Sequence, residues 1–219
     1  MIGSFDGKTF VPESGPHRTH YGSPYAGQTW SDVPRSDGRR IQMSCLRGDK
    51  PNMPFNQQMS FPCEISLRVT PECIRLFAEP VRELETLHAR ELDVLPAGKM
   101  PDLGAECLEI RMSLNTAMAT PDGSEIMNIH GLPLVYDQDA RSLRLGDKAA
   151  PCPDSGEELH LQILVDRSSV KAFAERGALS AATVPDNGAP TVVFGPRTGG
   201  YPVKKCEVFE LESIWSGNL

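Results

Sequence analysis

Aromatic and amide side chains are concentrated between positions 21 and 32 of the 219-residue chain. Aromatic faces stack on the C–H surfaces of sugar rings, and amide and carboxylate groups hydrogen-bond hydroxyls. These residue types could line a sugar site, and packing in a core or an interface is the alternative. The residues are Tyr21, Tyr25, Gln28, Trp30 and Asp32.

A second polar set lies further along the chain, close to Phe55 and Phe61. It consists of Arg47, Asn56, Gln57 and Gln58, and it could form the rim of the same pocket or belong to an ordinary loop. From both sets we take five residues as candidates for substrate binding. They are Tyr25, Gln28, Trp30, Arg47 and Gln57.

The carboxylates show no spacing typical of acid–base catalysis. Asp32, Glu64, Glu79 and Asp166 are separate in sequence, and solvated faces or turn hydrogen bonds account for them. The five His residues are scattered, and the six Cys residues form no CxxC pair and no zinc-finger spacing with His. We therefore expect free, mostly buried thiols in a reducing compartment, no catalytic residue, no metal and no cofactor.

The charge and hydropathy exclude several classes of partner. The net charge is -7, so the chain repels phosphate backbones and nucleic acid is not an expected partner. No apolar stretch is long enough to span a membrane. Residues 1–20 show no basic start followed by an apolar run, so we expect no signal peptide. The localisation stays open, and it is cytoplasmic if the chain is expressed as it stands.

Period-two alternation of apolar and polar residues predicts an all-β fold, because a strand points successive side chains to opposite faces. The clearest runs are Arg40–Leu46, Glu64–Val69, Cys107–Leu114 and Leu159–Val165. A last strand over Cys206–Trp215 alternates imperfectly, which indicates a bulge or coverage on both sides. Turn signals separate the strands. These are Asp6-Gly7, Asp37-Gly38, Asp122-Gly123 and Asp186-Asn187-Gly188.

One segment departs from this alternation. In Pro80–Arg90, apolar residues recur at three- to four-residue spacing, which predicts a short helix or a winding connector. We place a connector at residues 71–106, a smaller β region at 1–70 and a β-sandwich at 107–219. Strands spaced every 8–12 residues are typical of a sandwich.

Four stretches in this order resemble glycoside hydrolase family 32, which contains levanases, invertases and fructanases. They cover nearly the whole chain, and bacterial levanase-like members are the nearest in pattern. The stretches are Ile2–Glu13 (IGSFDGKTFVPE), Tyr21–Arg40 (YGSPYAGQTWSDVPRSDGRR), Met53–Arg82 (with MPFNQQMSFPCEISLR) and Leu161–Phe173 (LQILVDRSSVKAF).

The resemblance implies a five-bladed β-propeller followed by a C-terminal β-sandwich. Residues 1–70 resemble only the last part of the propeller, so the chain is expected to begin inside that domain. The family's retaining mechanism uses an Asp nucleophile and a Glu acid/base whose carboxyls lie about 5 Å apart. Its motifs Asn-Asp-Pro-Asn and Arg-Asp-Pro do not occur in this sequence.

The family's acid/base motif is Glu-Cys, and this dipeptide occurs at Glu72-Cys73 and Glu106-Cys107. Neither has the motif's neighbours, an aromatic residue before and Pro after, so both are interpreted as chance dipeptides. Two further positions depart from the family. Cys45 stands where a pocket-lining Trp is usual, and Lys171 stands where relatives carry Glu.

These features predict a C-terminal part of a levanase-like β-fructosidase that is inactive as an isolated chain. Two alternatives stay open: a subunit of a split fructan hydrolase, completed by a separate propeller chain, and a lectin-like or structural β-sandwich module. The expected partners are fructan or another carbohydrate and either a second copy of the chain or a complementary propeller chain.

Overall fold

The computed structural model describes residues 1–18, 20–48, 55–71, 73–93, 107–118, 125–152, 156–177, 179–183, 192–194 and 201–214. These residues form strands and one short 3-10 helix, η1 (Arg82–Leu87), so the predicted all-β class is confirmed. Among them, no helix has the length and apolar character needed to cross a membrane.

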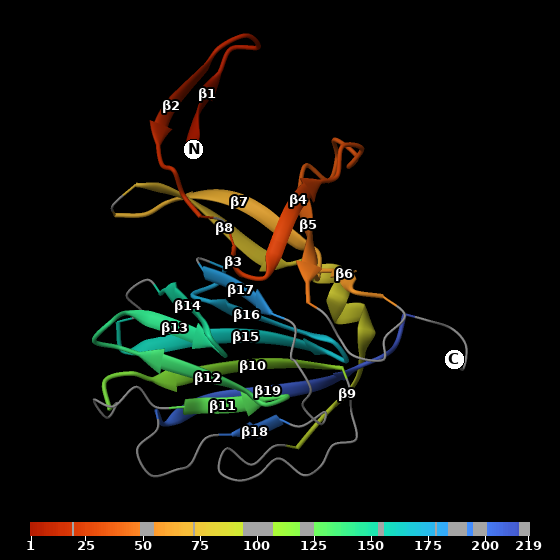
Figure 1. The fold of residues 1–219 in the computed structure, drawn as a ribbon, viewed down its shortest axis with the longest axis vertical. Coiled ribbons are helices and arrows are strands. Elements are labelled where there is room, and N and C mark those ends of the chain that lie inside the picture. The colour runs from red at the N-terminus through yellow and green to blue at the C-terminus, as the bar shows by residue number, and fades with distance from the viewer. Residues whose placement is uncertain are drawn as a thin grey trace.

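Two sheets form a β-sandwich in the lower part of Figure 1, as predicted. Sheet I has the order β3-β17-β16-β15-β10-β19-β9, and sheet II has the order β14-β13-β12-β11-β18. The strands of sheet I are β3 (Tyr21–Gly22), β9 (His88–Glu91), β10 (Leu108–Asn115), β15 (Glu158–Asp166), β16 (Ser169–Ala174), β17 (Leu179–Thr183) and β19 (Val203–Leu211). The strands of sheet II are β11 (Glu125–Ile129), β12 (Leu132–Asp137), β13 (Ser142–Leu145), β14 (Lys148–Pro151) and β18 (Val192–Phe194).

The core of the sandwich follows from the alternation in the sequence. Ile110 of β10 lies opposite Ile163 of β15, and both are fully buried between sheets I and II. Leu134 and Leu145 face them from sheet II and are buried as well. Each such side chain stabilises the fold by about 1.5–3 kcal/mol relative to an exposed position, which makes the sandwich the main source of stability.

A third sheet, sheet III, packs on the outer face of sheet I (Figure 1). Its order is β4-β5-β7-β8, with β6 paired to β5. Cys63 and Ala78 of sheet III form one apolar cluster with Leu164 and Phe173 of sheet I. The strands are β4 (Pro24–Thr29), β5 (Arg40–Arg47), β6 (Gln57–Met59), β7 (Cys63–Val69) and β8 (Ile74–Pro80). That sheet III represents the last part of a propeller stays a prediction.

A separate hairpin of β1 (Ile2–Phe5) and β2 (Phe10–Ser14) projects away from the other sheets (Figure 1). The predicted Asp6-Gly7 turn closes it. The Asp6 carboxylate accepts hydrogen bonds from the backbone N–H groups of Lys8 and Thr9, and Gly7 has a φ of 97°. Gly38 also adopts a positive φ, of 70°, at the second predicted turn.

Segments before and after sheet III return to the edges of sheet I. β3 adds parallel to β17 at one edge, and β9 adds antiparallel to β19 at the other. Gly22 is required in β3, since a Cβ there would lie 2.1 Å from the carbonyl oxygen of Ala182. The division into 1–70, 71–106 and 107–219 stays a prediction, and all three segments contribute strands to sheet I.

Some of the other predictions from the sequence agree with the structure, and others do not. The four alternating runs are strands, and Pro80–Arg90 contains η1 and β9. The last strand ends at Leu211 rather than at residue 215, because the next backbone N–H, of Glu212, bonds the Leu87 carbonyl after η1. Its pairings with both neighbours show register shifts, in agreement with the predicted bulge. Outside the described residues lie Glu72, Glu106, Trp215, Asp122-Gly123 and Asp186-Asn187-Gly188.

All six thiols are free, as expected. Cys63 and Cys152 are buried, whereas the other four are partly exposed, so burial is less complete than predicted.

A buried carboxylate connects β9 to the inner strands of sheet I. Glu109 of β10 is 1% exposed and accepts hydrogen bonds from His88 Nε2 (2.6 Å), Arg111 Nε (2.6 Å) and Gln162 Nε2 (2.5 Å). Burial alone would raise its pKa, but the bonds to Arg111, His88 and Gln162 together lower it. The His88 ring also stacks on Phe209 at 4.1 Å.

Replacing this carboxylate leaves its partners unpaired, so Glu109→Ala is expected to lower the free energy of unfolding by about 3 kcal/mol. The exposed Glu91→Ala serves as a control and should change it by less than about 0.5 kcal/mol. Because the folded-state pKa of Glu109 is lowered, its contribution is present above the unfolded pKa of about 4.3 and is lost as pH falls through the folded pKa. Urea unfolding from pH 7 to pH 3 measures both effects, and a pH-independent gap between wild type and Glu109→Gln would contradict the assignment.

Candidate functional site

The five candidate residues lie on one face of sheet III, and a β-bulge in β4 places them there. Tyr25 pairs with Cys45, whereas Gln28 pairs with Met43, so β4 has one extra residue between these pairs. Ala26 at the bulge has a φ of 49°. Residues opposite each other in an antiparallel pair share a face, so Tyr25 and Gln28 point the same way despite their odd spacing.

The face that carries Tyr25 and Gln28 extends in both directions along sheet III. The backbone N–H of Trp30 bonds the Ile41 carbonyl at 3.0 Å, which continues the register past β4. On the other side, Arg47 pairs with Gln57 of β6. Trp30, Arg47 and Gln57 therefore share the face of Tyr25 and Gln28, and we call it the outward face.

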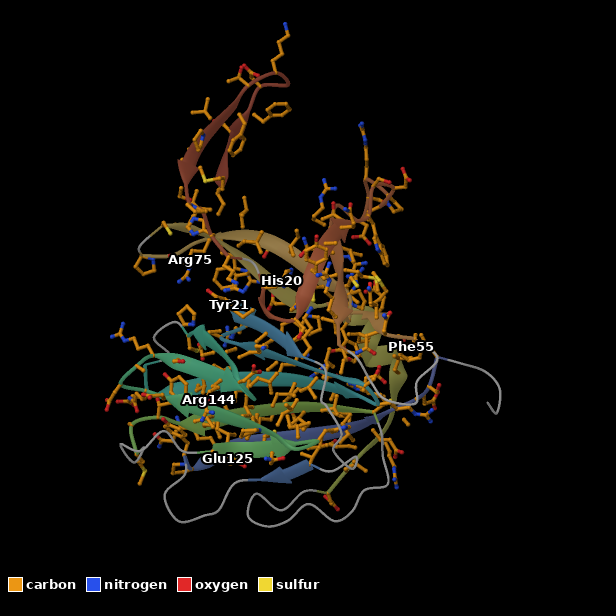
Figure 2. All side chains as sticks on the ribbon, in the orientation of Figure 1. His20, Tyr21, Phe55, Arg75, Glu125 and Arg144 are labelled. Carbon is orange, nitrogen blue, oxygen red and sulfur yellow. The ribbon has the colours of Figure 1, made fainter. Side chains whose placement is uncertain are left out.

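The opposite face of sheet III is turned toward the sandwich. It carries Gln42, the buried Ser44 and Leu46, and Cys63. Gln42 Oε1 lies 2.5 Å from His20 Nε2. Figure 2 places His20 and the neighbouring Tyr21 at the junction between sheet III and the sandwich.

Three candidates form direct contacts around Cys45. The Arg47 guanidinium lies 3.8 Å above the centre of the Tyr25 ring. Cys45 Sγ donates to Gln57 Oε1 at 3.2 Å. Tyr25 is 56% exposed, so its ring is open to a ligand on the side not used by Arg47. This group, Tyr25, Cys45, Arg47 and Gln57, offers an aromatic surface, a cation and an amide within one patch.

Trp30 lies apart from this patch, at a cavity of about 810 Å³. Its walls are mostly apolar and come from three segments: Trp30 and Ile41 from sheet III, Val81 and Leu84 around η1, and Ile214. Asp32 lines the same cavity and accepts a hydrogen bond from Ser31 Oγ at 3.0 Å. Gln28, opposite Met43, lies along the sheet between the patch and the cavity.

An ion-pair group at this cavity connects sheet III to η1. Arg39 donates to Asp37 (2.6 Å) and to Glu83 (2.7 Å), and all three residues line the cavity. The hydrogen bonds from Arg39 lower the pKa of both carboxyls to about 2. The sequence indicated only a turn at Asp37-Gly38, because Glu83 is 44 positions away from Arg39.

Two carboxylates that are distant in sequence become neighbours in sheet III. Glu64 of β7 lies directly opposite Glu79 of β8, which places such Cβ atoms about 5 Å apart. Glu79 forms an ion pair with Arg68. It also borders a groove of about 390 Å³ on the sandwich, which Glu64 does not line. Asp166 accepts from Cys107 Sγ at 3.4 Å and from the Arg167 N–H, at a turn.

Other residues of the predicted sets face elsewhere. Gln58 points to the sandwich, where its Nε2 donates to the Ser168 carbonyl at 2.8 Å. Gln57 and Gln58 lie in strand β6 and not in a loop, which was one of the two alternatives for this set. Tyr21 packs against the sandwich core. Among the described residues, no group of His, Cys, Asp and Glu side chains is arranged to hold a metal ion.

No protein-family model matches the chain, but two curated proteins similar to it are both levanases. A levanase of Bacillus subtilis (strain 168) is 26% identical across 98% of this chain, which spans 37% of that protein. A levanase of Bacillus sp. (strain L7) is 28% identical across 90% of this chain and 25% of its own length. The chain thus spans well under half the length of these curated relatives.

Solved structures show the same fold. An exo-inulinase from Aspergillus awamori superposes with a TM-score of 0.77 over 97% of this chain and 49% of its own, at 19% identity. At this identity the likeness establishes the fold alone. It supports the sandwich and sheet III as one arrangement shared with that protein.

The contact between Arg39 and Glu83 at the cavity beside Trp30 can be tested directly. In Arg39→Gln, both carboxyls lose their charged donor, so the pKa of Glu83 should rise from about 2 toward its ordinary value of about 4.3. Carbon-detected NMR titration of the Glu83 carboxyl measures this shift. Arg82→Gln is the control, since Arg82 lies 3.8 Å from Glu83 and is 75% exposed. A Glu83 pKa unchanged by Arg39→Gln would contradict the geometry.

Proposed function

Because the chain belongs to glycoside hydrolase family 32, matching a C-terminal part of its levanase-like members, we propose that it serves as the C-terminal part of a levanase-like fructan hydrolase. In this role the sandwich supports sheet III, and the outward face of sheet III contributes to fructan binding. The observation that carries the proposal is that the bulge in β4 brings all five candidate residues to that one face.

The chemistry of the outward face suits a neutral, hydroxyl-rich ligand. Tyr25 and Trp30 are 56% and 48% exposed and present flat apolar surfaces. Gln28, Arg47 and Gln57 supply donors and acceptors of the kind that hydroxyls require. Cys45 lies at the centre of the patch, where the family resemblance predicts Trp, and its small side chain offers no ring for stacking. We infer that affinity for sugar is correspondingly modest.

The proposal assigns no hydrolytic activity to these 219 residues by themselves. The family's nucleophile and stabiliser motifs are absent from the sequence. Glu64 and Glu79 are opposite each other, yet the ion pair with Arg68 engages Glu79. A retaining pair instead needs one free nucleophile and one protonated acid on either side of the scissile bond.

The isolated chain should therefore release no fructose from levan, inulin or sucrose above the buffer rate. Fructose release is measured with a coupled enzymatic assay, and an active levanase serves as the positive control. Turnover by the chain that is abolished by Glu64→Gln or Glu79→Gln would refute the assignment and identify this pair as catalytic.

Binding is expected to depend on the patch around Cys45. Tyr25→Ala removes the stacking surface and should weaken binding of levan oligosaccharides about tenfold, which corresponds to about 1.4 kcal/mol. Gln57→Ala removes a hydrogen-bonding partner and should weaken it about two- to tenfold. Isothermal titration calorimetry measures both constants. Phe10→Ala is the control, because Phe10 is an exposed aromatic residue on the distant hairpin; an equal loss in this variant would argue against a specific site.

A complementary propeller chain remains the second candidate. It is favoured by the apolar residues exposed on sheet III, of which Leu67 and Val69 are 58% and 84% exposed. Mixing this chain with a separately expressed propeller chain of a levanase and measuring fructose release tests it. Activity that appears only in the mixture supports a split enzyme, whereas no complex by light scattering excludes it for that partner.

A further inference from the structure

A lysine is buried where sheet III packs on the sandwich. Lys171 lies in the middle of β16 and is 2% exposed. Its Nζ contacts Cys63 Sγ of β7 at 2.8 Å and the Phe61 carbonyl oxygen at 3.4 Å. The ring of Phe173 lies 5.1 Å from the same nitrogen. Cys63 is itself 1% exposed, so the two side chains meet in a seam closed to solvent.

The surroundings of Lys171 are unusual for a buried amine. Buried charges in proteins are normally paired with an opposite charge. Among the described residues, no carboxylate forms an ion pair with Lys171, and its polar contacts are a thiol and a carbonyl. His20 lies close enough that the charge of Lys171, after burial itself, contributes to the lowered pKa of that imidazole. Cys63 is therefore the reactive group that the amine faces.

We propose that Cys63 and Lys171 form a covalent modification site, in which peroxide oxidation joins Cys63 Sγ to Lys171 Nζ through a sulfenamide bond. In the first step hydrogen peroxide oxidises the thiol to a sulfenic acid and is reduced to water. In the second step the Lys171 ammonium releases one proton to solvent, and its nitrogen lone pair attacks the sulfenic sulfur. The S–O bond breaks, and the hydroxyl leaves as water with a second proton from the nitrogen. In sum, the thiol, the ammonium and one molecule of hydrogen peroxide give the sulfenamide, two molecules of water and one proton.

The geometry favours this route over further oxidation. Reacting atoms held in contact gain a large effective concentration, and the nitrogen is already 2.8 Å from the sulfur. The seam limits access of a second peroxide molecule to the sulfenic acid. Oxidant reaches Cys63 only through local opening of the seam. Cys63 should therefore react more slowly than the partly exposed Cys45 and Cys73.

The bond would fasten sheet III to the sandwich. Cys63 and Lys171 are 108 positions apart, so the crosslink closes a long loop in the unfolded chain. Such a constraint lowers the entropy of the unfolded state and stabilises the folded one. The inference concerns the seam alone and does not depend on fructan binding.

Mass spectrometry of the peroxide-treated, folded chain tests the proposal. A sulfenamide predicts a peptide pair joined at Cys63 and Lys171, lighter by two hydrogen atoms than the reduced pair, without tryptic cleavage after Lys171. Thiol reductants should reverse it, and oxidation in urea should not produce it, because unfolding separates the two side chains. Separate peptides carrying only sulfinic or sulfonic Cys63 would overturn the proposal. A joined pair heavier by one oxygen atom would also contradict the direct S–N bond.

Two variants test whether the bond between Cys63 and Lys171 stabilises the folded chain. Lys171→Leu removes the amine without adding an oxidisable group, so peroxide should not raise its thermal midpoint, whereas the midpoint of the wild type should rise. Cys73→Ser is the matched control and should respond as the wild type does. If Lys171→Leu does not fold, the comparison of folded and urea-treated wild type still decides the question, since it needs no variant.

Discussion

Sheet III packs on the outer face of sheet I, and this packing determines which surfaces of both sheets are buried. One backbone hydrogen bond at this seam, from the Ala78 N–H to the Gly177 carbonyl (2.9 Å), connects β8 to the turn after β16. Gly177 has a φ of 86°, and a Cβ there would lie 2.5 Å from the Ala78 carbonyl oxygen. Only glycine allows the two backbones to approach so closely. Lys171 and Cys63 are buried together as a consequence of the same contact.

This seam determines which residues of sheet III are available to a ligand. Leu46 and Cys63 are buried against the sandwich, and the proposed binding residues lie on the opposite face. With strict alternation, Tyr25 and Gln28 would point to opposite faces of sheet III. The extra residue at the bulge near Ala26 places both side chains on the same face. The role proposed for the chain thus requires two local irregularities, a glycine at the seam and a bulge in β4.

Much of the fold could be predicted from the sequence, because alternation in runs such as Cys107–Leu114 reports burial directly. The candidate residues were chosen because aromatic and amide side chains suit sugars, and their role stays a prediction. Their common face was not predictable, because the bulge in β4 depends on pairing with β5. Contacts across long separations were missed for the same reason. Arg39 with Glu83 and Glu64 with Glu79 become neighbours only when the sheet forms. Lys171 was noticed as a departure from the family, but its partner Cys63 gave no signal in the sequence.

We propose that the outward face of sheet III binds carbohydrate, and backbone amide NMR spectra recorded during titration with levan oligosaccharides test this role. The chemical shift changes should concentrate at Tyr25, Gln28, Trp30, Arg47 and Gln57. A second surface offers a clear contrast, the polar groove of about 390 Å³ on the sandwich that is lined by Arg111, His160 and Lys205. Chemical shift changes confined to that groove, or none at saturating oligosaccharide, would show that the outward face does not bind levan.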